Sequence, residues 1–372
     1  MIIGVPVEIK NHEYRVGLIP ASVRELVDQG HEVIIETNAG AGINHYDDDY
    51  RAAGARIVDS AEDVFSQAEL IVKVKEPQAN ERKMLKTGQT LFTYLHLAPD
   101  YDQTRDLIES GATCIAYETV TDAGGRLPLL APMSEVAGRM SIQAGATCME
   151  KIHGGSGILL GGVPGVHQGD VLILGGGVVG YNAAEMAIGL GARVTILDRS
   201  IDVLRRLDQQ FGGRIQTLYS TRHTVEEAAM VADLIIGAVL IPGASAPKLV
   251  TAEMVKQMTP GTVLVDVAID QGGCFETSHP TTHADPTYVV DDVVHYCVAN
   301  MPGAVAKTSA AALNNATLPY VLQLAGKGVK RALMENTHLL NGLNVHAGKI
   351  TNEFVGVAHD IEYVDAGNAI AA

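Results

Sequence analysis

The feature that most constrains the fold is an alternation of short apolar runs with amphipathic stretches along most of the chain. The apolar runs, rich in Val, Ile and Leu, are typical of strands buried on both faces, and the amphipathic stretches between them are typical of helices. Such alternation indicates βαβ units, which bring parallel strands into one sheet with helices packed on it. We therefore predict an α/β protein with two doubly wound, Rossmann-like domains, each built on a parallel sheet.

The alternation falls into two series separated by a long helix. In the first series, strands are expected at 2–8, 31–37, 55–59, 70–75, 90–96 and 113–119. In the second series, they are expected at 170–176, 193–198, 215–220, 233–240 and 262–270, with 294–301 as a further candidate. A helix is expected over 134–152 with Ser134 as its N-cap, and the chain beyond residue 306 is expected to be mostly helical, without a further parallel series.

Length and charge narrow the class of protein. A chain of 372 residues is too long for one compact core and indicates two domains of ordinary size. With 47% hydrophobic and 19% charged residues, the composition is that of a folded globular protein. The net charge of −16 argues against nucleic acid and anionic membranes as partners, because both need a basic surface. It leaves anionic small molecules open, since these respond to local charge.

The cysteines and the N-terminus bear on the cellular compartment. The four cysteines lie far apart and form no CxxC pair, which indicates buried free thiols in a reducing compartment. They are Cys114, Cys148, Cys274 and Cys297. The first residues, MIIGVPVEIKNHEYR, lack the basic and apolar regions of a secretory signal, and no apolar run approaches the ~18 residues that span a bilayer. We expect a soluble, cytoplasmic protein.

The segment LILGGGVVGYNAAEMAIGLGARVTILD, residues 172–198, carries the most specific motif. Gly175, Gly177 and Gly180 form G-x-G-x-x-G directly after an apolar strand and ahead of a helix. The first glycine permits a tight turn, the second lets a pyrophosphate approach the backbone, and the third lets helix and strand pack closely. The pyrophosphate of a dinucleotide would then meet the N–H groups at the helix N-terminus.

An acidic residue follows at the expected place. Asp198 ends the next strand, about 20 residues beyond Gly177, where a carboxylate binds the adenosine ribose hydroxyls and repels the extra phosphate of NADP. Arg199, next to it, weakens the exclusion of NADP. A lone glycine triplet could be an ordinary tight turn, but strand, helix and acidic residue in register favour binding of NAD. The glycines of 157–166 lack this context and predict a loop or a short strand.

Polar residues also follow strands of the first series. Arg15 comes after the first strand, Lys75 closes the fourth and His96 closes the fifth. Because the carboxyl ends of parallel strands share one edge of a sheet, these three side chains are expected to converge on a crevice facing the dinucleotide. Two cations suit a small carboxylate, and a histidine can transfer protons near neutral pH. Taken singly, each has a plainer interpretation: a solvated arginine, a lysine at the surface and a hydrogen-bonded strand end.

The second series supplies carboxylates and histidines. In TVLVDVAID, Asp266 and Asp270 share one face of the expected strand, and Asp270 at its carboxyl end could order a water or an ammonium group. For Asp266 we favour a carboxylate bonded to a helix or a loop. Cys274, Glu276, His279 and His283 invite a metal site, but Pro280 between the histidines argues against a helical pair, so we predict no metal.

With these residues identified, the chain resembles the alanine dehydrogenases from end to end. The resemblance rests on GVPVEIKNHEYRVGLIP, VKVKEP, LFTYLHLA, AYETV, LPLLAPMSEVAGRMS, LLGGVPGV, LGGGVVG, VDVAIDQGGC, ANMPGAV and ALNNATLPY, in this order. It implies reversible, NAD-dependent oxidative deamination of L-alanine to pyruvate and ammonia. It also implies a discontinuous substrate domain, residues 1–128 and 307–372, interrupted by an NAD-binding domain, residues 129–306, and a homo-oligomer, most commonly a homohexamer.

The resemblance also assigns roles to residues. Arg15 and Lys75 would hold the substrate carboxylate, and His96 with Asp270 would form the acid/base pair. The cofactor contacts would be Ser134, Gly175, Gly177, Val178, Val179, Gly180, Asp198, Ser220, Val239, Leu240, Val267, Ala268, Ile269, Asp270, Val298, Asn300 and Met301. For Ser134, a plain helix cap is the leading alternative.

Two other functions remain open at this stage. The NAD-binding portion of a proton-translocating transhydrogenase shares the expected fold, but that family lacks counterparts of Lys75 and His96 and depends on a membrane portion. A non-catalytic NAD-binding sensor would keep the glycine motif and need no acid/base residue. An assay for turnover of L-alanine with NAD distinguishes the dehydrogenase from the transhydrogenase portion and from the sensor.

Overall fold

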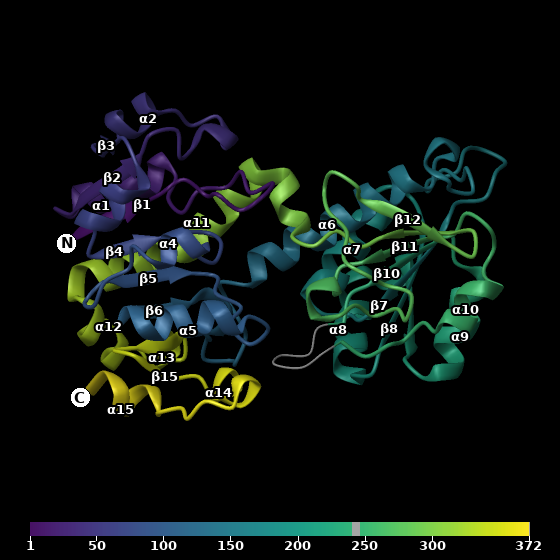
Figure 1. Cartoon of the computed structure of the whole chain (residues 1–372). Helices are drawn as coiled ribbons and strands as arrows, with labels where there is room; N and C mark the ends of the chain where they lie inside the picture. The colour runs from purple at the N-terminus through teal and green to yellow at the C-terminus, as the bar shows by residue number, and fades with distance from the viewer. Residues whose placement is uncertain (240–245, 372) are drawn as a thin grey trace. The chain divides into compact units, whose positions relative to one another are not determined.

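The computed structural model describes residues 1–239 and 246–371, and the chain divides into two compact units. The first unit comprises Met1–Met133 and Gly303–Ala372, so both ends of the chain belong to it (Figure 1). The second unit comprises Ser134–Pro302. Leu240, one of the predicted cofactor contacts, lies outside the described residues.

The first unit is built on an eight-stranded sheet with the order β15-β14-β6-β5-β4-β1-β2-β3. Its strands are β1 (Ile2–Val5), β2 (Glu32–Glu36), β3 (Arg56–Val58), β4 (Leu70–Val72), β5 (Thr90–Thr93), β6 (Thr113–Ala116), β14 (Leu343–His346) and β15 (Lys349–Ile350). The six strands from β6 to β3 run parallel, whereas β14 pairs antiparallel with β6 and β15 antiparallel with β14. Chain order reverses at β1, which lies between β2 and β4.

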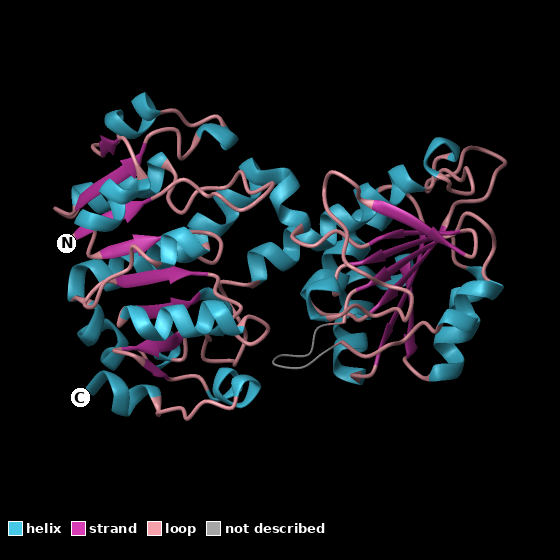
Figure 2. Cartoon of the chain, in the orientation of Figure 1, coloured by secondary structure: helices cyan, strands magenta, loops and turns pink. Residues whose placement is uncertain are grey.

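Helices lie on both faces of this sheet (Figure 2). They are α1 (Pro20–Asp28), α2 (Asp47–Ala52), α3 (Ala61–Gln67), α4 (Ala79–Arg82), α5 (Tyr101–Ser110), α11 (Ala306–Lys327), α12 (Val329–Glu335), α13 (Thr337–Leu340), α14 (Glu353–His359) and α15 (Ala366–Ala371). Because both faces are covered, strand residues such as Ile3, Ile71 and Leu91 are fully buried, as the unbroken apolar runs predicted.

The second unit has a seven-stranded sheet with the order β12-β13-β11-β10-β7-β8-β9. Its strands are β7 (Asp170–Leu174), β8 (Arg193–Asp198), β9 (Ile215–Tyr219), β10 (Leu234–Gly237), β11 (Val263–Asp266), β12 (Thr287–Val290) and β13 (Val293–Tyr296). All neighbours are parallel except the hairpin of β12 and β13. Chain order reverses at β7, as expected for a dinucleotide-binding sheet. The helices are α7 (Val178–Gly189), α8 (Ile201–Phe211), α9 (Arg222–Val231) and α10 (Ala252–Gln257).

The predicted fold class is confirmed, with antiparallel additions at the edges. The strands β12, β14 and β15 were not predicted; each is short, and each adds an antiparallel partner to a parallel sheet. At the start of α3, the side chain of Ser60 caps the helix by accepting a hydrogen bond from the backbone N–H of Asp63.

Several predicted strands are longer than the observed ones. The run 70–75 forms a strand only to Val72, 90–96 only to Thr93, and 262–270 only to Asp266. Beyond each end, backbone N–H groups bond to a carboxylate: Val74 to Glu8, His96 to Glu118, and Ala268 to Asp266. Apolar periodicity cannot detect this change of partner, because it records burial and not hydrogen bonding.

The long helix between the two series also differs from the prediction. It is α6 (Ala131–Cys148), which begins three residues before Ser134. Ser134 is therefore inside the first turn, and its interpretation as the N-cap was wrong. The residues LPLLAPM ahead of it are apolar enough to extend the helix toward its N-terminus, with Pro132 in the first turn, where proline is tolerated.

The cysteine prediction is confirmed: all four cysteines are free and buried. Burial raises the pKa of Cys114 to about 12 and that of Cys148 to about 11. Among the described residues, no helix is both long and apolar enough to cross a membrane.

Candidate active site

In the first unit, the predicted site residues follow the carboxyl ends of adjacent parallel strands. Arg15 follows β1, Lys75 follows β4 and His96 follows β5, and these strands are neighbours in the sheet. Glu118, which the sequence analysis did not single out, follows β6, the next strand along. The four side chains therefore come from one edge of the sheet, and chain order reverses at β1, the strand that Arg15 follows and that pairs with β4.

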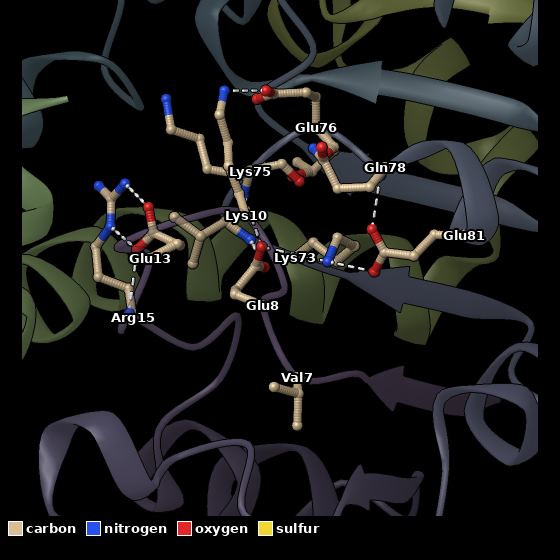
Figure 3. A network of polar contacts seen from close by, with 12 residues as sticks. Val7, Glu8, Lys10, Glu13, Arg15, Lys73, Lys75, Glu76, Gln78 and Glu81 are labelled. Atoms are coloured by element: carbon tan, nitrogen blue, oxygen red, sulfur yellow. Dashed lines mark hydrogen bonds and ion pairs between the residues drawn. The ribbon is translucent and has the colours of Figure 1, made fainter. Parts of the chain in front are cut away.

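Arg15 is buried, so its interpretation as a solvated side chain was wrong. Its side chain is 2% exposed and forms a two-point ion pair with Glu13, with Nε and Nη2 at 2.6 and 2.5 Å from the carboxylate oxygens (Figure 3). Nη1 lies 3.0 Å from the sulfur of Met133. Burial alone would lower the pKa of Arg15, but the ion pair with Glu13 outweighs it and raises the pKa. The guanidinium is thus charged and held in one orientation.

Two lysines two residues apart have different surroundings. Lys73 is 1% exposed and lies between Glu8 at 3.2 Å and Glu81 at 2.8 Å (Figure 3). Burial would lower the pKa of Lys73, but the two carboxylates outweigh it and raise the pKa, while burial raises the pKa of Glu8. Glu8 also accepts the N–H of Val74 at 2.6 Å, so this buried group fixes the chain that leads to Lys75.

Lys75 itself is half-buried and lies beyond the end of β4, not within it. Its carbonyl oxygen accepts the hydroxyl of Thr93 at 2.9 Å, which ties it to the end of β5. Burial would raise the pKa of Glu76, but the nearby charge of Lys75 and the ion pair with Lys10 outweigh it and lower the pKa. Lys75 therefore adds positive charge at this sheet edge.

His96 lies three residues past β5 and has an unusual backbone. Its φ is +49°, in the left-handed region that residues other than glycine seldom adopt. Its N–H donates to Glu118 Oε1 at 2.6 Å, and its Nδ1 lies 3.9 Å from the same oxygen. The imidazole stacks on the ring of Tyr94, with 5.8 Å between centroids and 7° between planes. The side chain is 45% exposed, so a small molecule can reach it.

Tyr94 connects these residues. Its hydroxyl donates to the carbonyl of Leu129 at 2.5 Å, and its ring meets Tyr117 edge-on. Burial raises the pKa of Tyr94 well beyond its usual range, while the charge of Arg15 acts in the opposite direction. Tyr94, His96 and Glu118 are thus connected by direct contacts in the first unit.

Four residues of this neighbourhood were missed by sequence reasoning: Glu13, Lys73, Tyr94 and Glu118. Glu118 follows β6 just as His96 follows β5, so the rule that identified His96 would have found it. Tyr94 and Glu13 lie two residues from His96 and Arg15, but their contacts depend on loop conformation. The burial of Lys73 could not be predicted from the sequence, because a lysine within an apolar run is ordinarily expected to be exposed to solvent.

In the second unit, the glycine motif forms the predicted strand-to-helix turn between β7 and α7. Gly175 has φ +101°, and a Cβ at that position would lie 2.8 Å from the carbonyl oxygen of Ala238. A Cβ at Gly180 would lie 1.8 Å from the carbonyl oxygen of Gly175, so only glycine fits there. At Gly177, by contrast, a Cβ would meet no atom of the described residues within 4 Å, so the backbone is open to a ligand.

The helix start beyond this turn fits a dinucleotide. Gly177 is the N-cap of α7, and no side chain of the described residues caps the helix. Val178 is exposed and Val179 half-buried, so the first-turn N–H groups face an accessible surface. Uncapped N–H groups and the helix dipole together favour an anionic group such as a pyrophosphate. The residues present therefore suit the cofactor that the motif predicted.

Asp198 is the last residue of β8 and touches the glycine turn. Its Oδ2 accepts the N–H of Gly176 and its Oδ1 that of Ser200, each at 2.7 Å. Its carbonyl oxygen accepts the N–H of Ser220, which brings the end of β9 beside it. Arg199 is exposed. Each carboxylate oxygen of Asp198 retains acceptor capacity for a ribose hydroxyl.

The segment after β11 is arranged around Asp266. This carboxylate is fully buried and accepts hydrogen bonds from the backbone of Ala268 and Cys274 and from the hydroxyl of Ser278. Burial raises the pKa of Asp266, and these bonds counteract the rise. The loop-bonded interpretation of Asp266 is confirmed. Asp270 lies in a short 3-10 helix, Ile269–Gln271, where it is exposed, so the two aspartates do not share a strand face as predicted.

The other predicted cofactor contacts lie at ends of strands or in adjoining turns. Val239 follows β10 and Val267 follows β11, both half-buried, whereas Val298 and Met301 are almost fully buried. Asn300 has φ +61°, and its carbonyl oxygen lies 3.1 Å from Nε2 of His283. His279 stacks on Tyr288 instead of facing His283. Among the described residues, no group of three metal-ligating side chains is present.

Comparisons with known proteins give a consistent result. Sequence models of one family match residues 4–137, as "Alanine dehydrogenase/PNT, N-terminal domain", and residues 141–353, as "Alanine dehydrogenase/PNT, C-terminal domain". Alanine dehydrogenases of Halomonas elongata and Mycolicibacterium smegmatis are 61% and 56% identical, each over the full length of both chains.

Solved structures extend this comparison to the fold. An L-alanine dehydrogenase superimposes with a TM-score of 0.94 at 55% identity, covering 97% of this chain and 99% of that one. A transhydrogenase from Sinorhizobium meliloti has a TM-score of 0.81 at 24% identity, covering 95% of this chain and 99% of that one. The second match shows a shared fold only.

Proposed function

The chain belongs to the alanine dehydrogenase/PNT family, and from that premise we propose that it catalyses the reversible, NAD-dependent oxidative deamination of L-alanine to pyruvate and ammonia. Family membership makes the protein an amino-acid dehydrogenase that acts on small molecules with a nicotinamide cofactor. The observation that carries the finer proposal is the set of basic side chains after β1, β4 and β5, of which His96 stacks on Tyr94.

Arg15 and Lys75 are the proposed anchors of the substrate carboxylate. The ion pair with Glu13 keeps the guanidinium charged and oriented, and Lys75 adds a second positive charge from the neighbouring strand. A carboxylate held by charge-assisted hydrogen bonds is fixed in both position and direction. With the carboxylate fixed, Cα of the substrate is held in one orientation toward the hydride acceptor. Holding the reacting atoms in one geometry is the basis of catalysis by proximity.

His96 is the proposed general acid and base. In the deamination direction, the amine loses a proton, Cα loses a hydride, water adds to the iminium carbon, and ammonia leaves with a proton. The 45% exposure of the imidazole and its contacts with Tyr94 and Glu118 support this role. Such transfers typically contribute about 10²–10⁴-fold to a rate. Asp270, exposed in the second unit, is the proposed second member of the acid/base pair.

The glycine turn and its surroundings are the proposed NAD site. When bound, NAD supplies the hydride acceptor. The uncapped start of α7 would hold the pyrophosphate, and Asp198 would hold the ribose. The further proposed contacts are Ser134, Val178, Val179, Ser220, Val239, Val267, Ala268, Ile269, Asp270, Val298, Asn300 and Met301. A carboxylate at Asp198 supports NAD over NADP, because it repels a phosphate.

We assign the substrate to the domain of residues 1–128 and 307–372, and NAD to the domain of residues 129–306. We further propose a cytoplasmic homohexamer, as in the resemblance described above. Analytical ultracentrifugation of the full chain tests the oligomer: a single species of six times 39.3 kDa is expected, and a monomer would contradict it.

The decisive experiment is an assay of purified protein with L-alanine and NAD at alkaline pH, following NADH absorbance. We expect NADH formation that depends on both compounds, and the reverse reaction with pyruvate, ammonium and NADH near neutral pH. Glycine and L-serine serve as matched substrates, since they share the carboxylate and the amine. NAD binding by calorimetry without turnover of any amino acid would contradict the proposal and favour a non-catalytic NAD sensor.

A further inference from the structure

We propose that Glu118 is a positioning residue for His96, holding its backbone and its imidazole in the arrangement that proton transfer needs. This inference rests on the proposed function, because the position of His96 matters to turnover only if His96 transfers protons.

The backbone of His96 needs an external hold. At φ +49° a residue with a side chain is in an unfavourable conformation, which persists where its surroundings impose it. Glu118 supplies that hold, since its Oε1 accepts the N–H of His96 at 2.6 Å and both oxygens lie 3.2 Å from the N–H of Leu95. One carboxylate thus binds two consecutive N–H groups at the end of β5.

The imidazole is restrained on two sides. Nδ1 lies 3.9 Å from Glu118 Oε1, which is too far for a hydrogen bond but close for a charge. The opposite restraint is the ring of Tyr94, stacked at 5.8 Å and anchored by its hydroxyl to Leu129. Because Nδ1 lies near Glu118, we assign the proton transfer with the substrate to the other ring nitrogen, Nε2.

Glu118 is itself on a rigid support. It is the middle residue of a short 3-10 helix, Tyr117–Thr119, that follows β6. Tyr117 is fully buried and donates to the carbonyl oxygen of Lys73, and Thr119 accepts a hydrogen bond from Asn344. The carboxylate is 15% exposed. A group that orients a catalytic side chain is effective when its own position is fixed by packing and hydrogen bonds.

The test compares Glu118→Gln and Glu118→Ala with the wild type in the L-alanine assay. Glutamine keeps one acceptor oxygen for the N–H of His96, so we expect kcat to fall about tenfold in Glu118→Gln and about a hundredfold in Glu118→Ala. The KM for L-alanine and the Kd for NAD should change less than about threefold, because the proposed role of Glu118 is to hold His96 and not to bind either compound.

A double variant separates positioning from a general structural role. If Glu118 acts through His96, adding Glu118→Gln to His96→Ala should leave the residual kcat unchanged within about twofold. An independent contribution would instead lower it by the same factor as in the single variant. Glu118→Gln is nearly isosteric with the wild type, so it keeps the test valid if Glu118→Ala does not fold.

The first unit offers a matched control. Asn38 also has a left-handed backbone, at φ +65°, and its N–H donates to the carboxylate of Asp47 at 2.8 Å. Asp47→Asn makes the same change of carboxylate to amide at a comparable contact away from His96. We expect it to lower thermal stability while kcat remains within about twofold of the wild type.

The outcomes distinguish this inference from the proposed function. If the wild type oxidises L-alanine and Glu118→Gln keeps a near wild-type kcat, or if the double variant shows additive losses, the positioning role is overturned and the proposed function stands. If His96→Ala retains full activity, the role of His96 fails and the inference fails with it. If the wild type turns over no amino acid, the proposed function is overturned, and the inference that rests on it is overturned as well.

Discussion

The carboxyl edges of the two sheets are built in opposite ways. In the first unit the edge carries large charged and aromatic side chains, among them Arg15, Lys73 and Tyr94, held by contacts between residues distant in sequence. In the second unit the corresponding edge includes a glycine turn between β7 and α7, where Gly175 and Gly180 leave room for backbone alone. Both edges lie where chain order reverses in a parallel sheet.

The difference follows from the ligand that each edge suits. A pyrophosphate is bound by backbone N–H groups, which become available only where side chains do not intervene. A small amino acid offers one carboxylate and one amine, which need charged groups at defined positions. Substitutions at the two edges should therefore impair the protein in different ways. In the second unit, a methyl group added at the glycine turn should impair pyrophosphate binding. In the first unit, loss of a charged group should impair binding of the amino acid.

The largest effect is expected from Gly180→Ala. Its Cβ would lie 1.8 Å from the carbonyl oxygen of Gly175, so the turn or the start of α7 must move. We expect loss of measurable NAD binding by calorimetry and a lower melting temperature. Gly189→Ala is the control, because its Cβ on the same helix would meet no atom of the described residues within 4 Å. Equal NAD affinity in both variants would remove the argument for a backbone cradle.

His96→Ala is expected to lower kcat for L-alanine by about 10²–10⁴-fold, because the imidazole is the proposed proton carrier. The Kd for NAD should change less than about twofold, since the glycine turn belongs to the other unit. His45→Ala, which removes a histidine whose ring lies 4.0 Å from Asp49, is the matched control. A His96→Ala enzyme with near wild-type kcat would refute the acid/base role.

The two lysines of VKVKEP should separate stability from activity. Lys73→Met leaves Glu8 and Glu81 buried without their cation, and breaking such a group typically costs about 3–5 kcal/mol of unfolding free energy. Lys75→Met should cost less than about 1 kcal/mol, because Lys75 is half-buried, yet lower kcat/KM for L-alanine. Urea denaturation and steady-state kinetics on both variants provide the measurement. Equal losses of unfolding free energy in the two variants would contradict a special contribution of Lys73 and its two buried carboxylates to stability.

The smallest effect is expected from Asp198→Asn. The amide keeps one acceptor for the N–H of Gly176 but loses the charge that favours NAD over NADP. We expect a roughly tenfold rise in Kd for NAD, equal to about 1.4 kcal/mol, and a smaller preference over NADP. Asp202→Asn is the control, since the Asp202 side chain is 89% exposed and pairs with Arg205 on the helix surface. Unchanged coenzyme kinetics would count against a role for Asp198.

Much of the fold was predictable because burial leaves a local record. The six parallel strands of the first sheet and the Rossmann order of the second follow runs of apolar residues that tertiary contacts only had to bring together. Strand ends were mispredicted at Val72, Thr93 and Asp266, where backbone N–H groups turn to carboxylates. The short antiparallel strands β14 and β15 escaped notice because two to four residues carry too little periodicity.

The candidate site likewise includes residues that the sequence identified and residues that it did not. The glycine turn with Asp198 was identified from spacing, since strand, turn and helix are contiguous in sequence. In the first unit, the residues that contact His96 and Arg15 were not identified from the sequence. Glu118 is 22 residues from His96 in the chain, and Met133 is 118 residues from Arg15. Nor did any pattern show that Lys73, two residues before Lys75, is buried between two carboxylates.

The amino-acid order alone determined where most of the strands and helices form, where glycines allow a tight turn, and which basic residues follow strands, because each depends on near neighbours. Only the three-dimensional arrangement decided which lysine is buried between Glu8 and Glu81, which carboxylate holds His96 at φ +49°, and how Arg15 is oriented. Those outcomes depend on desolvation and on charges brought together from separate segments, and neither is encoded in the local spacing of residues.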